Sequence, residues 1–374
     1  VAGRRVPALF NGMAIAADWM SAATFIGLAG TLYLGGFGGL AFVMGWTGGF
    51  CLVALLLAPY LRKFGQFTIP DFLAERFGGS WSRSIGAVLA VVCSFTYLVA
   101  QIYGVGLITT HLLGVAFEIG VFVGLGGVLV CSFLGGMRAV TWTQVAQCMV
   151  LVVAYLTPVV WLSVKQTGVL LPHLSFGSQL QKVSEREQEI LKDPKEQQVI
   201  EIFRARSEAL RDKLDHVPES LAQDRAAARE RIESLKGRPE DALDLYAAER
   251  ALSDLPADVE AAKALWTRMQ AAAESQARPL AGMPEHATPF AGDPSGDASQ
   301  RKAFDESRRN FLALAFCLML GTAGLPHMLT RFYTTTSVPA ARSSVAWSLF
   351  FILLVYLTAP ALAVLVKYEI LHSL

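Results

Sequence analysis

The stretch NGMAIAADWMSAATFIGLAG, residues Asn11 to Gly30, places a single acid, Asp18, within a run of apolar and small residues. The run is long enough to cross a bilayer as a helix, which takes about 20 residues. An ionised carboxylate at that depth costs about 2.5–3.5 kcal/mol, so the acid needs a partner or a water-lined cavity. One interpretation is an ion or solute site. The other is a tolerated acid near the cytoplasmic side, hydrated through the helix end.

The same stretch is predicted to be a broken helix. Glycine and serine weaken helices intrinsically, and Gly12, Ser21, Gly27 and Gly30 surround or flank its small-residue centre. Local unwinding would free backbone carbonyl oxygens near mid-bilayer. Sodium is a hard cation that takes several oxygen ligands, and broken transporter helices supply them. The first span is therefore a candidate cation site.

Charge is distributed very unevenly along the 374 residues. Of the 63 Lys, Arg, Asp and Glu residues, 47 lie between Gln181 and Asn310, and the rest of the chain is strongly apolar. This split indicates a membrane protein with a charged extramembrane insertion. The net charge of +1 and the lack of a basic tract give no sign of nucleic-acid binding.

Apolar runs predict seven membrane helices, because only helices satisfy their own backbone groups in lipid. We therefore predict an all-α polytopic membrane protein: residues 1–175 carry five spans, 176–308 form a soluble, mainly helical insertion, and 309–374 carry two further spans. The predicted spans are Leu9–Tyr33, Gly38–Tyr60, Ile85–Leu113, Ile119–Leu134, Val145–Val164, Phe311–Leu329 and Ser344–Val366.

Loop charges predict the orientation. With Val1 in the cytoplasm, the short outer loops and tail hold only Lys165 and Lys367, as the positive-inside rule requires. Residues 166–308 then lie outside, in the periplasm if the membrane is a bacterial inner membrane. The positive charges of the inner loops under this assignment are Arg4, Arg5, Arg62, Lys63, Arg76, Arg83, Arg138, Arg331 and Arg342.

The insertion itself has two parts. From Gln181 to about Gln276, charges of mixed sign at three- and four-residue spacing predict solvated helices in a hairpin or bundle, with breaks near Gly237, Pro239 and Pro256. The segment from Arg278 to Ser299 is rich in Pro, Gly and Ser and is predicted to be irregular or disordered. Solvated faces explain the charges; docking of a periplasmic partner is the alternative.

No catalytic constellation is evident. The five cysteines lie in apolar runs without metal-ligand spacing, and the sequence shows no phosphate loop and no nucleophile–base pair. We therefore expect neither an enzyme nor a protein with a resident cofactor.

Several stretches carry a family resemblance. VAGRRVPALFNGMAIAADWMSAATFIGLAGTLYLGGFGGL resembles the opening of the sodium:solute symporter family, especially its bacterial cation/acetate symporter (acetate permease) branch. Three further stretches resemble that family in the same order along the chain, so the similarity covers nearly all of the apolar sequence. They are LRKFGQFTIPDFLAERFG (Leu61–Gly78), GGMRAVTWTQVAQ (Gly135–Gln147) and GTAGLPHMLTRFYTT (Gly321–Thr335).

The resemblance implies a leucine-transporter-like inverted-repeat fold, of which this chain would hold core helices one to seven. We expect a fragment, since the chain begins at Val1 and the resemblance places further helices before it and after Leu374. Sodium would bind backbone carbonyls of Ala17 and Met20, with Ser21 adjacent. Its hydroxyl partners would lie on the eighth core helix, beyond this chain.

The resemblance also implies a solute site. Trp19, Ala23 and Thr24 match solute-facing positions in the first core helix, and Asp18 is assigned to the same site. Short side chains at 23 and 24 favour a small solute. The sixth core helix would contribute Pro326, which interrupts it, together with His327 and Met328. For His327, contact with a carboxylate and a bond to a neighbouring carbonyl both stay open.

Four further polar residues have an expected role in this comparison. Gln144 stands where proline-transporting relatives carry an acid, which weakens a proline assignment. Gln101 and Tyr103 either line the permeation path or bond between helices. Arg331 is expected at the cytoplasmic end as a topogenic or structural charge.

These features predict sodium-coupled symport of a small monocarboxylate such as acetate across the bacterial inner membrane. Sodium is then the coupling ion, and the lipid bilayer, the solute and a periplasmic partner of the insertion are the remaining partners. The alternatives are coupling to protons, another solute such as pyruvate, lactate or propionate, or a solute sensor of the same fold.

Overall fold

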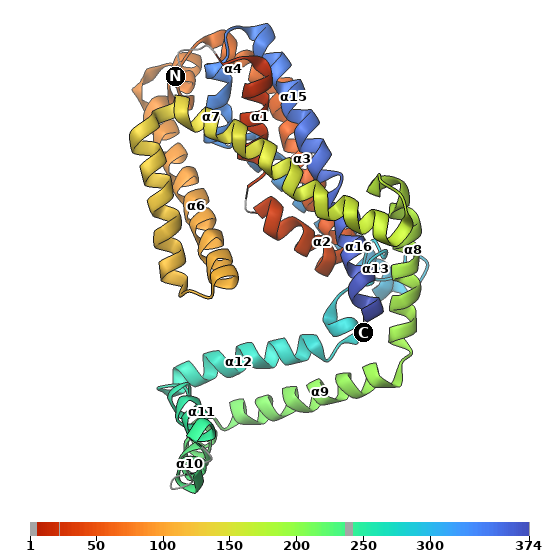
Figure 1. Ribbon diagram of the computed structural model, residues 1–374. Helices are drawn as coiled ribbons and strands as arrows, with labels where there is room; N and C mark the ends of the chain where they lie inside the picture. Colours follow the sequence, from red (N-terminus) through yellow and green to blue (C-terminus); the bar gives the residue numbers. More distant parts are fainter. Residues whose placement is uncertain (1–5, 22, 236–241, 374) are drawn as a thin grey trace. The chain divides into compact units, whose positions relative to one another are not determined.

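The computed structural model describes residues 6–21, 23–235 and 242–373. They are almost entirely helical, with one isolated β-bridge between Val6 and Thr335 (Figure 1). Contacts between Cα atoms divide the chain into two compact units. The first contains residues 1–184 and 286–374, and the second contains residues 185–285.

The first predicted span is interrupted. It consists of α1 (Ala8–Trp19), the π-helical segment η2 (Ala23–Leu28) and α2 (Ala29–Gly35), with a break after Trp19. A short 3₁₀ turn, η3 (Gly36–Gly39), leads into the second span, which is made of α3 (Leu40–Leu52), η4 (Val53–Leu57) and α4 (Ala58–Phe64). The predicted discontinuity of the opening helix is therefore confirmed.

The next spans form a hairpin and a long helix. After α5 (Ile69–Phe77), α6 (Gly79–Leu113) packs against the first half of α7 (Phe117–Thr167) (Figure 1). The two halves of α7 meet at Gly136, whose φ of 55° favours glycine because a side chain is strained there. The fourth and fifth predicted spans are thus separated by this kink rather than by a loop.

The sixth span is bent. It consists of α13 (Ala298–Ala323), α14 (Pro326–Leu329) and η7 (Thr330–Thr334), with an angle of 49° at the break. The last span is α15 (Val338–Tyr356) followed by α16 (Ala359–Ser373). Among the described residues, four helices are long and apolar enough to cross a membrane, or five with the bent pair. In that group the second span is counted from Ala29, so Ala29–Phe64 includes α2 of the broken first span, whereas α1 and the short apolar helix Phe117–Val130 fall outside it.

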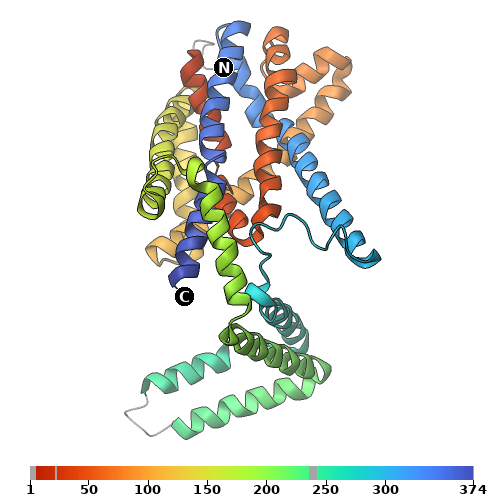
Figure 2. The same ribbon diagram turned by 90° about the vertical axis from the view of Figure 1, so that its right-hand side faces the viewer.

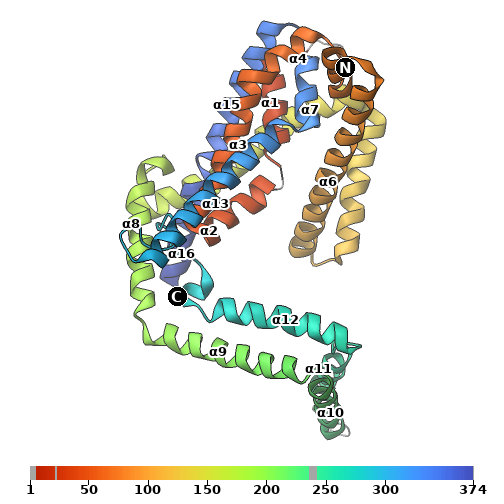
Figure 3. The ribbon, with the colours of Figure 1, turned by 180° about the vertical axis from the view of Figure 1, so that it is seen from behind.

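Burial is concentrated around α1. Ala14, Ile15 and Ala16 have no exposed surface, and α1 packs against α15 and α7. On the other side of the unit, α13 packs along α3 (Figure 3). The α6 helix instead exposes many apolar side chains, such as Val91 and Phe95, as expected for a surface in contact with lipid acyl chains.

The second unit is a set of antiparallel helices. After α8 (Pro172–Leu191), α9 (Pro194–Asp215) lies beside α12 (Val259–Gln276), while α10 (Val217–Leu235) lies beside α11 (Ala242–Ser253) (Figure 2). Asp193 and Asp258 cap α9 and α12 by accepting backbone hydrogen bonds. The predicted break at Pro256 falls between α11 and α12, whereas Gly237 and Pro239 lie outside the described residues.

The Pro/Gly-rich segment that follows is irregular, as predicted, but part of it packs tightly. In the first unit, the amide of Phe37 donates to the carbonyl of His286 at 3.1 Å. The ring of Phe290 packs against those of Phe37, Phe304 and Phe311, with centroids 5.3–5.8 Å apart. Packing between aromatic rings therefore orders part of a stretch whose composition is also compatible with disorder.

Candidate functional site

The break after α1 changes the hydrogen-bond acceptors of two backbone amides. In a continuous helix, Ser21 N–H would donate to the Ala17 carbonyl and Thr24 N–H to the Met20 carbonyl. Here Ser21 donates to Trp19 at 2.9 Å, and Thr24 donates to Ser21 at 3.0 Å. The carbonyls of Ala17 and Met20, the two predicted cation ligands, therefore lack the amides that a regular helix gives them.

A second break lies opposite the first. The helix α13 ends at Ala323, and Pro326 begins α14 after Gly324 and Leu325. Proline has no N–H to donate and its ring excludes the preceding helical turn, so it suits the first position of a new helix. The predicted interruption of the sixth core helix at Pro326 is confirmed.

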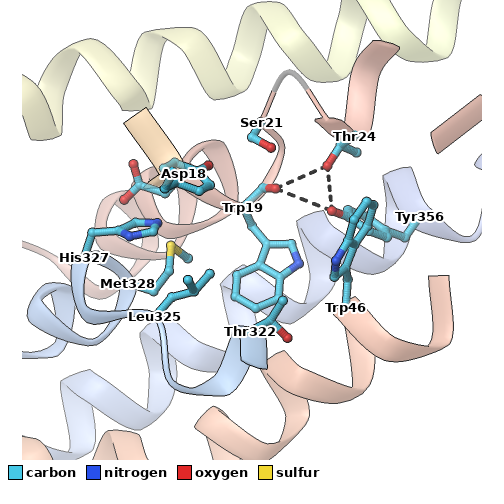
Figure 4. A pocket seen from close by; sticks show the side chains of 11 residues that line it. Asp18, Trp19, Ser21, Thr24, Trp46, Thr322, Leu325, His327, Met328 and Tyr356 are labelled. Carbon is cyan, nitrogen blue, oxygen red and sulfur yellow. Dashed lines mark hydrogen bonds between the residues drawn. The ribbon is translucent and has the colours of Figure 1, made fainter. Parts of the chain in front are cut away.

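A cavity of about 100 Å³ lies at these two breaks (Figure 4). Of the predicted solute-binding residues, Asp18, Trp19, Thr24, His327 and Met328 line it, as does Ser21 from the predicted cation site. Pro326 begins the adjoining helix without lining the cavity, and the side chain of Ala23 lies outside the described residues. The complete lining is Asp18, Trp19, Ser21, Thr24, Trp46, Tyr97, Thr322, Leu325, His327, Met328 and Tyr356.

Sequence reasoning missed five of these residues. They come from α3, α6, the end of α13, the following break and α15: Trp46, Tyr97, Thr322, Leu325 and Tyr356. On α6 the sequence points to Gln101 and Tyr103 instead. Neither lines the cavity, and Tyr103 is 56% exposed and packs on Phe117. A tyrosine within an apolar span is a signal for a cavity residue. However, α6 carries two tyrosines, Tyr97 and Tyr103, and only their packing shows which one lines the cavity.

Asp18 has a charged partner far away in the sequence. Arg331 Nε donates to Asp18 Oδ2 at 2.6 Å, and Arg331 Nη2 donates to Oδ1 at 3.3 Å. Only 4% of the Arg331 surface is exposed. Arg331 is therefore a structural charge, one of its two expected roles, and not a topogenic charge at the membrane surface, because its guanidinium is buried against the Asp18 carboxylate. Two-point contact of this kind fits the planar guanidinium.

Two residues of the second half of α7 complete this network. Gln144 Nε2 donates to Asp18 Oδ1, and Arg331 Nη2 donates to Gln144 Oε1. Arg331 Nη1 also donates to Thr141 Oγ1 at 3.1 Å. Because Gln144 is a neutral amide, the network holds one positive and one negative charge. An acid at this position would leave the network with an excess negative charge.

The two ends of the cavity differ in chemistry (Figure 4). At one end, Asp18 lies beside His327, whose ring contacts Tyr97 with centroids 4.6 Å apart. At the other end, Trp46 and Tyr356 lie together, with ring centroids 6.1 Å apart. The cavity therefore has a polar end near the Asp18–Arg331 pair and an aromatic end formed by α3 and α15.

Comparisons with known proteins agree with this arrangement. The family model described as "Sodium:solute symporter family" matches residues 1–208. "Uncharacterized symporter H16_A2524" of Cupriavidus necator is 51% identical over 380 residues, covering all of this chain and 54% of that protein. "Uncharacterized symporter YwcA" of Bacillus subtilis is 35% identical over 152 residues, covering 40% of this chain and 29% of that protein. No solved structure matches the chain.

The relatives also bear on length and on the insertion. The chain spans about half the length of the Cupriavidus protein, and its match to the Bacillus protein covers less than a third of that protein. The match to the Cupriavidus protein covers the whole chain, so it includes the charged helices of the second unit. Taken together with the broken helices, the family match decides the assignment: the chain belongs to the sodium:solute symporter family.

Proposed function

We propose that the natural protein containing this chain is a secondary active transporter that couples sodium entry to the uptake of a small monocarboxylate such as acetate. The observation that carries the proposal is the cavity at the two helix breaks. Discontinuous helices at mid-membrane expose backbone groups to a solute and its coupling ion, which a continuous helix cannot do.

The first break supports sodium as the coupling ion. The carbonyls of Ala17 and Met20 have lost their regular helical donors, and the Ser21 hydroxyl lies next to them in the chain. Carbonyl and hydroxyl oxygens are ligands that a hard, singly charged cation accepts. These three residues would supply part of the coordination. The family resemblance assigns the remaining oxygens to a later helix.

Cavity size supports a small solute. An apolar cavity of about 150 Å³ can bind benzene, so a cavity of about 100 Å³ suits a solute with few heavy atoms. Acetate is of that size, whereas a sugar is far larger. Propionate, pyruvate and lactate are the nearest alternatives.

The charges around the cavity are compatible with an anion. An unpaired Asp18 carboxylate would repel a carboxylate solute strongly in a medium of low dielectric constant. Its ion pair with Arg331 cancels that charge, and the His327 ring in the cavity wall offers a hydrogen-bond donor. A monocarboxylate would accordingly bind with its charged group toward this polar end.

We place the protein in the bacterial inner membrane, with Val1 cytoplasmic and residues 166–308 periplasmic, on the charge distribution of the loops. Rocking of one helix bundle against another would then expose the cavity to each side in turn. The second unit would face the periplasm, where a protein partner could dock on its charged helices.

Proton coupling is the closest competing function. A histidine whose ring lies in the cavity with an aspartate could exchange a proton with a solute during transport. The two mechanisms differ in their driving ion, so they are separable by experiment.

Uptake of radiolabelled acetate by the full-length protein in proteoliposomes tests the proposal. An inward sodium gradient should drive accumulation, and replacement of external sodium by choline should abolish it. A pH gradient alone should not support uptake. Accumulation that follows the pH gradient and ignores sodium would establish the proton-coupled alternative, and absence of acetate uptake under every gradient would refute the proposed solute.

A further inference from the structure

At the aromatic end of the cavity, hydrogen bonds link Tyr356 to two residues of the broken first span, Thr24 and Trp19. The hydroxyls of Thr24 and Tyr356 lie 2.6 Å apart and share one hydrogen bond. Both hydroxyls also lie near the carbonyl oxygen of Trp19, at 3.3 and 3.4 Å respectively. Tyr356 is 1% exposed. This tyrosine is therefore tied to the broken first span and has little freedom to change its rotamer.

Trp46 and Tyr356 together form the wall at the aromatic end of the cavity. The Trp46 ring packs edge-on against Tyr356 and against Phe42 one turn earlier in α3, with centroids 6.1 and 5.5 Å apart. The helix that carries it cannot withdraw easily, because α3 packs tightly on α13. A Cβ added at Gly49 would lie within 2.8 Å of the Met319 carbonyl oxygen. The indole is thus backed by a fixed helix and a fixed ring.

This wall limits how far a bound solute can extend from the polar end of the cavity. A carboxylate solute oriented by the polar end, with Asp18 and His327, would point its hydrocarbon chain toward Trp46 and Tyr356 (Figure 4). In a close-packed pocket, one additional methylene that fits or clashes changes selectivity by about 10–200-fold. A rigid indole at the end of a cavity of about 100 Å³ would exclude longer chains in this way.

We propose that Trp46, braced by Tyr356, sets the maximum chain length of the transported monocarboxylate. This inference rests on the proposed function, since it assumes that the cavity binds the solute with its carboxylate at the polar end. It assigns a specificity role to a residue of α3 outside both helix breaks.

The test compares chain-length selectivity in the full-length protein. Uptake of labelled acetate is measured with unlabelled acetate, propionate, butyrate and hexanoate as competitors, in the natural protein and in Trp46→Ala. The natural protein should prefer the shortest acids. In Trp46→Ala, butyrate and hexanoate should gain at least about tenfold in competition relative to acetate. The matched control is Trp161→Ala, which removes an indole that is 61% exposed and does not line the cavity, and its selectivity should not change.

Two further variants keep the result interpretable. Trp46→Phe retains an aromatic ring of smaller size and should shift selectivity by about one methylene, even if the alanine variant folds poorly. Tyr356→Phe keeps the ring and removes the hydroxyl contacts, so it should loosen selectivity less than Trp46→Ala does. Purified variants are also tested for thermal stabilisation by acetate and by hexanoate, a readout that needs no transport.

The outcomes separate the two proposals. If the natural protein transports acetate and both Trp46 variants keep its chain-length order, in uptake and in thermal stabilisation, the role of Trp46 is refuted while the proposed function stands. If the natural protein neither transports nor binds any of the acids, the proposed function fails, and the role of Trp46 fails with it. A shift toward longer acids in both Trp46 variants supports the inference.

Discussion

Asp18 and Arg331 are 313 positions apart in the sequence, yet the carboxylate of one accepts two hydrogen bonds from the guanidinium of the other. The pair joins the end of α1, just before the first break, to η7, which follows the bend of the sixth span. Each break places a charged side chain within the protein, and each charge compensates the other. The ion pair thus connects the two irregular segments that form the cavity.

Removing one member of this pair should be more harmful than removing both. A buried charge left without its partner costs about 3–5 kcal/mol, whereas a neutral replacement of the whole pair can cost little. We expect Arg331→Gln and Asp18→Asn each to lower the unfolding temperature of the detergent-solubilised protein strongly. The double variant Asp18→Asn/Arg331→Gln should recover most of the loss.

The matched control for the ion pair is Lys165→Gln. Lys165 and Glu369 form a pair with about 45% of each side chain exposed, and such pairs contribute about 0–1 kcal/mol. A double variant no more stable than the less stable single variant would show that the two charges do not stabilise each other.

Gln144→Glu should weaken binding of an anionic solute. The amide bridges Asp18 and Arg331, so a carboxylate of nearly the same shape adds one negative charge to a neutral network. Charge repulsion near the cavity should raise the KM for acetate about tenfold or more. Uptake kinetics measure this effect, and Gln101→Glu adds the same charge on α6 outside the cavity lining. Equal effects of the two substitutions would contradict a specific role for Gln144.

Local signals in the sequence predicted both helix breaks. Gly and Ser around Asp18 weaken the first span, and Pro326 cannot continue a helix, so each break follows from the residues at the break itself. The same holds for the charged helices of the insertion, whose pattern repeats every three to four residues. Helix breaks and helical periodicity depend on residues that are close together in the sequence, so they can be predicted from it.

The partners of those breaks could not be predicted, because they depend on how distant helices pack. Arg331 follows a predicted membrane span in the sequence, and its charge alone suggested the membrane surface. Only the bend after Ala323 turns it inward to meet Asp18. Tyr356 likewise lies in a strongly apolar run, in which nothing in the sequence marks it as a cavity residue. Its contact with Thr24 exists only because α15 packs beside the first span.

Close packing of α3 on α13 predicts a strong effect of Gly49→Leu. A Cβ at this position would lie 2.8 Å from the Met319 carbonyl oxygen and even closer to the Thr322 hydroxyl. Overpacking in a dense interior costs about 1–3 kcal/mol, and more where backbone must move. We expect a clear fall in unfolding temperature and in folded yield. Gly126→Leu is the control, because nothing lies within 4 Å of its added Cβ; a similar loss there would point to helix propensity instead.

His286 should make the packing of the irregular segment sensitive to acid. Burial, reinforced by the charge of Lys367, lowers the pKa of His286 to about 4 from its usual 6.5. The unfolded chain therefore binds a proton on this histidine between about pH 6.5 and pH 4, while the folded chain does not. Its contribution to stability is complete above pH 6.5 and is lost as the pH falls toward 4.

A side chain that does not titrate in this range should remove that part of the pH dependence. In His286→Gln, the difference in unfolding temperature between pH 7 and pH 4.5 should be smaller than in the natural protein. Acid protonates many carboxylates as well, so the variant is compared with His216→Gln, which changes an exposed histidine of the second unit. If His286→Gln and His216→Gln reduce the difference equally, burial of His286 is not the cause. The Phe37 amide and the Phe37 ring hold this segment in place through the His286 carbonyl and the Phe290 ring, and only a packed imidazole resists protonation in this way.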